Sequence, residues 1–156
     1  MSGFVVSTRF YKRSSFVAHL PESYLYTPSH YWLMDEGDGV WRVGYTKFAT
    51  RMLGELVDVG FEVGEGGEVA VGGIVGSLEG FKAISDIYAV GAGCFAGANP
   101  LLKGGPEVVS KDPFGEGWLY RVRGTPDPQA MGIDGYIGLL DGTIDRILES
   151  QDGEGH

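Results

Sequence analysis

The stretch SLEGFKAISDIY, residues 77–88, decides the fold of this chain. Apolar residues alternate with polar ones on both sides of five central residues, Glu79 to Ala83, and a glycine lies within those five. Two strands that bracket a short glycine-containing segment are typical of a β-hairpin. The sequence therefore predicts a hairpin with Lys82 at its tip.

Lys82 is the only lysine between Lys47 and Lys103. Most exposed lysines have no special role, since an ammonium group is simply most stable in water. A hairpin tip, however, presents one amine to a modifying enzyme without exposing the core. The nearby carboxylates of Glu79 and Asp86 would give that enzyme a charge pattern to read, and acylation would remove the charge of the amine. We therefore interpret Lys82 as a candidate site of covalent attachment.

Glycine-rich strand patterns surround this hairpin. The chain has 27 glycines in 156 residues, against a usual ~7%, and they concentrate between residues 60 and 117. Glycine adopts the positive φ that tight turns need, so this composition is typical of many short strands. The predicted strands cover residues 31–34, 40–44, 55–62, 69–78, 84–90, 91–97 and 117–122, with turns at 35–39, 64–67 and 112–115 and a loop over 99–111.

Two helices interrupt the strand patterns. Thr46 is a suitable N-cap for a helix that ends near Gly54, and apolar residues recur about every fourth position over 133–148. The predicted organisation is an N-terminal extension of mixed charge and weak pattern over 1–23, a main domain over 24–124, and a helical segment over 125–156 that packs on that domain, with residues 152–156 frayed.

The composition excludes several classes of function. The formal net charge is -9, so the chain lacks the basic surface that a nucleic acid or an anionic membrane would require. No apolar run approaches the ~20 residues of a membrane span, and residues 1–15 hold no continuous apolar region typical of a secretory signal. A single cysteine excludes an internal disulfide. A cytoplasmic protein is expected.

The other candidate residues do not form a pattern typical of a metal site or a nucleotide site. The three histidines lack the spacing of a metal site, and no glycine run matches a nucleotide-binding motif. We interpret His30 as a hydrogen-bonded residue on a half-buried strand. Cys94 lies in an apolar, small-residue strand, where burial would keep the thiol unreactive. Both stay candidates for a surface that contacts an attached group or a partner.

Several ordered motifs resemble the H protein of the glycine cleavage system, a family that carries lipoate. They are YTPSHYW at 26–32, GYTKFA at 44–49 with LGELV at 53–57, EGFKAISDIY at 79–88, NPLL at 99–102 and DPFGEGWL at 112–119. Their order and spacing match over about residues 26–122. In this alignment of motifs, Lys82 falls at the lipoylated position.

The resemblance implies a mainly β, lipoyl-domain-like barrel-sandwich hybrid. Its two small antiparallel sheets would pack on each other, with a short helix in the N-terminal half and a helix at the C-terminus. It also implies a carrier rather than an enzyme, with lipoate amide-linked to Lys82 as a swinging arm that exchanges thiols and disulfides. A lipoate ligase or lipoyl-transfer enzyme would recognise the tip residues Glu79, Gly80, Phe81, Ala83 and Asp86. Biotin is not expected, because methionines flank the lysine in biotin carriers.

The chain also departs from the family pattern. Gly80-Phe81 replaces the usual Ser-Val before the lysine, and residues 88–96 lose a proline and a glutamate. The segment EGFKA resembles a divergent bacterial branch, the lipoate-binding proteins of the heterodisulfide-reductase-like sulfur oxidation system. That resemblance implies transport of sulfur or electrons between sulfur transferases and the reductase-like complex. The alternatives are aminomethyl transport among the glycine cleavage enzymes and a non-lipoylated adaptor with the same fold.

Overall fold

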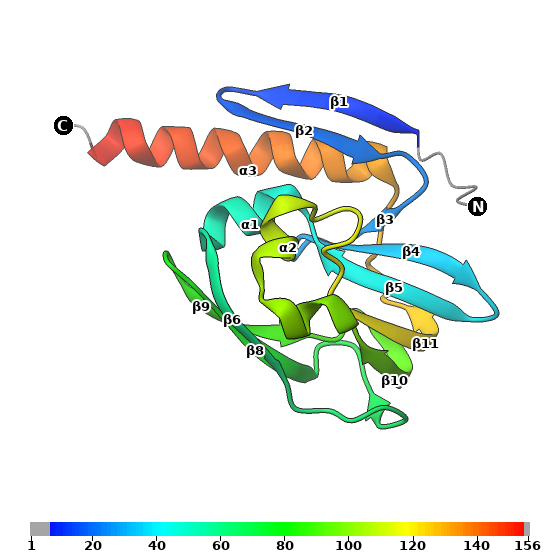
Figure 1. Ribbon diagram of the computed structural model, residues 1–156. Coiled ribbons are helices and arrows are strands. Elements are labelled where there is room, and N and C mark those ends of the chain that lie inside the picture. The colour runs from blue at the N-terminus through cyan, green and yellow to red at the C-terminus, as the bar shows by residue number, and fades with distance from the viewer. Residues whose placement is uncertain (1–6, 155–156) are drawn as a thin grey trace.

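The computed structural model describes residues 7–154, which form three antiparallel sheets and three α-helices (Figure 1). The first sheet is the hairpin β1 (Thr8–Arg13) and β2 (Phe16–Pro21). The second has the order β3 (Leu25–Tyr26), β4 (Tyr31–Gly37), β5 (Val40–Tyr45), β11 (Tyr120–Pro126), β10 (Gly91–Ala98) and β7 (Glu68–Val69). The third has the order β6 (Leu56–Phe61), β8 (Ile74–Gly80) and β9 (Ile84–Tyr88). The mainly β class is therefore as predicted.

The second and third sheets pack face to face around the main core. Val75 and Leu78 of β8 and Ile87 of β9 are buried, whereas Ser77, Glu79 and Asp86 face solvent. A register shift between Ile74 and Gly76 separates Val75 from the regular alternation that follows it. Opposite them, Phe95 of β10 and Val122 of β11 are buried in the same apolar cluster. A period of two thus puts one face of each sheet inside, as the sequence pattern requires.

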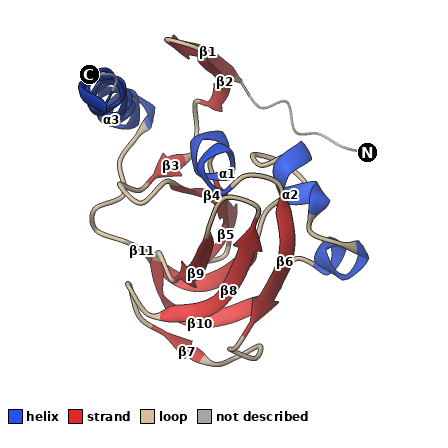
Figure 2. Ribbon diagram, turned by 90° about the vertical axis from the view of Figure 1, so that its left-hand side faces the viewer, coloured by secondary structure: helices blue, strands red, loops and turns tan. Residues whose placement is uncertain are grey.

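Helices and the N-terminal hairpin cover one end of this sandwich. Helix α1 (Lys47–Leu53) begins as predicted at Thr46, whose side chain accepts a hydrogen bond from the Ala49 N–H, and it ends at Gly54. Helix α3 (Ile133–Glu154) lies beside the hairpin β1–β2, and both stand at the end of the molecule away from β7 and β10 (Figures 1 and 2). A second apolar cluster joins them to the sandwich through the buried residues Phe16, Leu20, Trp32, Phe48, Tyr136 and Leu140.

Several predicted elements differ in the structure. Residues 1–23 were expected to show little pattern, yet 8–21 form the hairpin β1–β2, a third sheet beside the two expected. The loop expected over 99–111 contains a 3-10 helix, η1 (Pro100–Gly104), and helix α2 (Glu107–Lys111). The side chain of Asn99 accepts a hydrogen bond from the Leu101 N–H, which starts η1.

The remaining differences concern the ends of elements. The strand expected over 69–78 is two strands, because a turn at Gly72-Gly73 separates β7 from β8. The last strand starts at Tyr120 and continues to Pro126, where a break was expected. Helix α3 continues to Glu154, six residues beyond the end of the predicted apolar pattern, and residues 155–156 lie outside the described part. The fraying expected from residue 152 stays a prediction.

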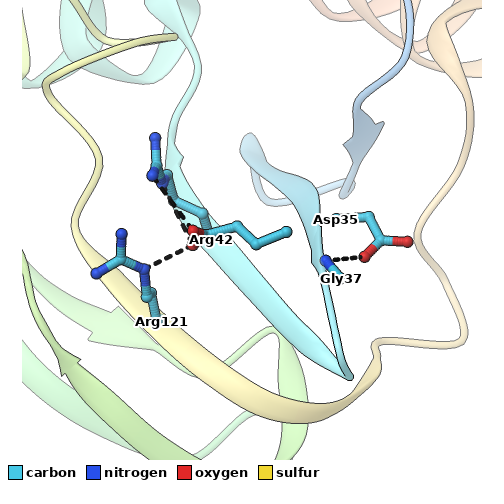
Figure 3. Close-up of polar contacts among 5 residues, drawn as sticks. Asp35, Gly37, Arg42 and Arg121 are labelled. Atoms are coloured by element: carbon cyan, nitrogen blue, oxygen red, sulfur yellow. Dashed lines mark hydrogen bonds and ion pairs between the residues drawn. The ribbon is translucent and has the colours of Figure 1, made fainter. Parts of the chain in front are cut away.

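A charged cluster ties β4, β5 and β11 together on the outer face of the second sheet (Figure 3). Arg121 donates to Glu36 at 2.6 Å, and Arg42 lies 3.3 Å from the other oxygen of the same carboxylate. Both guanidinium groups also lie over the ring of Trp118. Partial burial would raise the pKa of Glu36, but the two arginines outweigh it and hold that pKa below its usual value.

Within the described residues, no helix combines the length and the apolar composition that crossing a bilayer requires.

Candidate functional site

Lys82 lies in the turn between β8 and β9, at the tip of the hairpin that the sequence predicts. Glu79 and Ile84 are the last residues paired across the two strands, and the Gly80 N–H donates to the Ala83 carbonyl at 2.8 Å. The lysine side chain is exposed. The tip therefore presents one primary amine to solvent.

The main chain of this tip is docked on the end of α1. The Lys82 N–H donates to the Leu53 carbonyl at 3.0 Å, and the Phe81 N–H donates to the Glu55 carbonyl at 3.0 Å. The Lys82 Nζ lies 3.4 Å from the Arg51 carbonyl. Carbonyls at a helix C-terminus have no partners within the helix. Helix α1 thus holds the backbone of the tip in place while the amine stays accessible.

Two glycines make this docking possible. Gly54 caps α1 with φ +76°, and a Cβ there would lie 3.0 Å from the Lys82 Cγ. At Gly80 a Cβ would lie 2.3 Å from the Leu53 carbonyl oxygen. Real Cβ atoms do not approach that closely, so any larger residue at position 80 would separate the hairpin from the helix.

Three carboxylates without cationic partners lie on the strands of the third sheet, which carries the tip. Glu79 faces Asp58 of β6 in the strand register, and Asp86 lies two pairs further along the β8–β9 hairpin, opposite Ser77. All three carboxylates are exposed, and among the described residues none forms an ion pair. Like charges opposite each other destabilise a sheet. The acidic patch of Asp58, Glu79 and Asp86 is therefore a feature that the fold itself does not require.

Large apolar side chains flank the amine. Phe81 and Ile84 are each 76% exposed, and Met52 and Val57 are also largely exposed. The sequence predicted a tip role for Phe81 but gave no reason to single out Ile84. Exposed apolar side chains around a modifiable amine indicate a contact surface for another molecule.

The comparisons with known proteins show which family the chain belongs to. The family model described as "Glycine cleavage H-protein" matches residues 24–132. The chain belongs to the glycine cleavage H-protein family. The glycine cleavage system H protein of Pseudoalteromonas translucida is 38% identical over 133 residues, which cover 80% of this chain and 98% of the relative. That of Pseudoalteromonas atlantica is 35% identical over 122 residues, covering 75% and 90%.

A solved structure gives the same result for the fold. The crystal structure of a glycine cleavage system H protein from Mycobacterium marinum superposes with a TM-score of 0.69 at 32% identity, and the match covers 76% of this chain and 97% of that chain. Members of the H-protein family are lipoyl carriers, with lipoate attached covalently to a lysine. The hairpin β1–β2 precedes the part of the chain that the family model matches.

His30 lies away from the tip of this H-protein family member. It occupies a turn just before β4, with φ +71°, rather than the half-buried strand that was expected. Its Nδ1 is 2.8 Å from the Tyr136 hydroxyl, and its ring packs on Phe48. The His30 carbonyl accepts the Thr46 N–H at the start of α1, whereas Lys82 contacts the end of that helix. Its contacts are therefore with the core rather than with the tip.

Cys94 was expected to be buried, and this is wrong. It is exposed on β10, between Glu68 of β7 and Arg123 of β11 in the register. The reason is the strand period: the next residue, Phe95, faces the core, so Cys94 faces solvent. Cys94 and Lys82 lie on different sheets.

A tyrosine network that sequence reasoning missed holds the end of β9. The Tyr31 hydroxyl accepts the Tyr88 N–H at 2.9 Å. The Tyr120 hydroxyl donates to the Tyr88 carbonyl at 2.9 Å and accepts the Val90 N–H at 3.1 Å. Burial raises the pKa of Tyr31 and of Tyr120. The aromatic residues near 24–31 were visible in the sequence, but their partners are distant in it.

No group of three or more His, Cys, Asp or Glu side chains is placed to hold a metal ion in the part of the chain that the structure describes.

Proposed function

We propose that Lys82 is the lipoate attachment site and that this protein carries the aminomethyl group among the enzymes of glycine cleavage. The observation that carries the proposal is the exposed amine of Lys82 on a tip whose main chain is fixed to α1. The names of the relatives support the choice of glycine cleavage.

The tip fits a long covalent arm. An amide at Nζ would replace only the contact of that atom with the Arg51 carbonyl, at 3.4 Å, and would leave the backbone hydrogen bonds of the turn intact. When bound, the lipoyl group supplies a dithiolane that accepts a group or two electrons. The protein supplies a rigid base for the arm. Tethering then raises the effective concentration of the arm at each docked partner.

The acidic patch suits recognition by the enzyme that attaches lipoate. Asp58, Glu79 and Asp86 place negative charge around one ammonium group. A ligase or lipoyl-transfer enzyme with a basic rim would be oriented by this pattern, since complementary charge directs encounter. Acylation removes the charge of Lys82 and leaves the carboxylates, so the modified and unmodified tips differ in charge.

Sulfur transport is the second candidate, and one observation favours it. Phe81 and Ile84 present two large apolar side chains beside the lysine, each 76% exposed. The EGFKA segment that contains Phe81 is the part of the sequence that resembles the sulfur oxidation branch. In this alternative, the arm carries sulfur or electrons between sulfur transferases and a heterodisulfide-reductase-like complex.

The test is a mass spectrum of the Lys82 peptide from the native host, with the protein trapped quickly. A lipoyl adduct supports the carrier, an aminomethyl group on it supports glycine cleavage, and extra sulfur supports the second candidate. The matched control is Lys103→Arg, which should keep the adduct, whereas Lys82→Arg should abolish it. A bare Lys82, in cells whose other lipoyl proteins are modified, would overturn both candidates in favour of a non-lipoylated adaptor.

A further inference from the structure

A hollow of about 460 Å³ lies between the N-terminal hairpin and the segment that follows α2. Thr8, His19 and Pro21 line it from the hairpin side, and these residues precede the part of the chain that the family model matches. The opposite side comes from α1 and from residues 110–115. An element outside the family match therefore completes this hollow.

The lining of the hollow carries two positive side chains, although the molecule as a whole is negatively charged. The whole chain has a net charge of -9, yet Lys47 and Lys111 both line the hollow. Among the described residues, neither lysine forms an ion pair. The single carboxylate in the lining, Asp112, accepts the Glu116 N–H at 2.9 Å and so belongs to its own turn. Two ammonium groups thus lack partners within the fold.

The rest of the lining is rigid and largely apolar. The Tyr24 hydroxyl donates to the Phe114 carbonyl at 2.7 Å, and the Tyr24 ring packs on Trp32 with ring centres 4.7 Å apart. Trp32 in turn donates to the Pro113 carbonyl at 2.8 Å. Pockets for small organic molecules typically measure about 300–1,000 Å³ and combine apolar walls with a few polar groups. The size and walls of this hollow match that class.

We propose that this hollow binds a small amphipathic anion, an apolar group that bears a carboxylate or a phosphate. Lys47 and Lys111 pair with the anion, and the apolar part lies against Phe114. The site is separate from the tip, so its occupancy does not depend on lipoylation.

The test uses the full chain with Lys82→Arg, so that the arm plays no part. Benzoate and phenyl phosphate are titrated up to about 10 mM and followed by amide shifts in NMR spectra. Benzyl alcohol, which lacks the charge, and inorganic phosphate, which lacks the apolar part, are the reference probes. We expect saturable shifts at residues 110–115 with one or both aromatic anions, and weaker binding of both reference probes. Comparison of the two anions distinguishes a carboxylate from a phosphate ligand.

Variants then assign the site. The double variant Lys47→Ala, Lys111→Ala should weaken binding about tenfold or more, because charge-assisted contacts are lost. Lys12 lies on the N-terminal hairpin but does not line the hollow, so Lys12→Ala should bind the anion as tightly as the parent does. The proposal fails if neither aromatic anion saturates, if the double variant binds as tightly as Lys12→Ala, or if inorganic phosphate binds equally well.

Discussion

The imidazole of His30 is the clearest case of one residue serving the fold. The Tyr136 hydroxyl donates its proton to Thr46 Oγ1 at 2.9 Å, so it must accept from Nδ1–H of a neutral His30 at 2.8 Å. Thr46 in turn accepts the Ala49 N–H and caps α1. One chain of hydrogen bonds therefore joins the turn before β4 to α1 and α3. Burial lowers the pKa of His30 to about 4.

This pKa predicts a loss of stability in mild acid. Between pH 6.5 and about pH 4 the unfolded chain binds a proton at His30 that the folded chain does not, so the free energy of unfolding falls by up to about 3 kcal/mol as the pH is lowered through that range. His30→Asn, which tolerates the positive φ, should flatten this part of the curve in urea unfolding at several pH values. Equal slopes for His30→Asn and the parent would contradict the assignment.

Charge at single positions of the tip should control attachment. Glu79→Lys places a cation beside Lys82 and removes part of the acidic patch, so we expect lipoylation in vitro to slow several-fold. Glu65→Lys makes the same charge change in the turn between β6 and β7 and serves as the control. If the two variants are lipoylated at the same rate, the modifying enzyme does not recognise the acidic patch.

At the scale of elements, the tip and α1 form one unit. The turn after β8 donates two backbone N–H groups to carbonyls at and just beyond the end of α1, and these groups lie about 30 residues apart in sequence. These contacts give hydrogen-bond partners both to the N–H groups of the turn and to the free carbonyls at the helix terminus. The position of the amine is therefore fixed by the end of a helix, rather than by the hairpin alone.

Gly80→Ala should break this unit. The added Cβ would lie 2.3 Å from the Leu53 carbonyl oxygen, so the hairpin must move off α1, at a cost of about 1–3 kcal/mol. Hydrogen exchange at the amides of Phe81 and Lys82 should speed up, and lipoylation should slow. Gly60→Ala is the control, because a Cβ there has nothing within 4 Å. Unchanged exchange in Gly80→Ala would show that the tip does not depend on the docking.

At the scale of the whole molecule, the N-terminal hairpin joins α3 to the sandwich. Arg13 donates to Asp145 at 2.7 Å and Tyr11 donates to Asp141 at 2.7 Å, both on α3. On the inner face, Phe16 meets Phe48 of α1 edge to face with ring centres 5.5 Å apart. The Arg13–Asp145 ion pair is at the surface, where such pairs contribute little. The buried aromatic contact is thus the stronger link.

Two phenylalanines of the hairpin allow a matched comparison. Phe16→Ala removes a buried ring and should lower the free energy of unfolding by about 3 kcal/mol. Phe10→Ala removes a ring that is 58% exposed and should change it by no more than about 0.5 kcal/mol. Urea unfolding of both variants tests this. Similar losses in the two would mean that the hairpin is not packed as the structure shows.

Local patterns allowed much of this molecule to be predicted from its sequence. The tip at Lys82, the cap at Thr46 and the helix end at Gly54 depend on residues within a few positions of each other, and all three are found. The ordered motifs over 26–122 gave the family in the same way. The hairpin β1–β2 was missed because its burial depends on α3, which lies over a hundred residues further along the chain.

The sequence by itself determined which amine stands at the tip and which family the chain belongs to, because turn chemistry and motif spacing are local. Only the tertiary structure decided that the tip rests on α1, that Cys94 faces solvent, and that the hairpin encloses a hollow with Lys47 and Lys111. These features join segments far apart in sequence. They exist only after the sheets and helices have packed, because burial and hydrogen-bond partners are set by that packing.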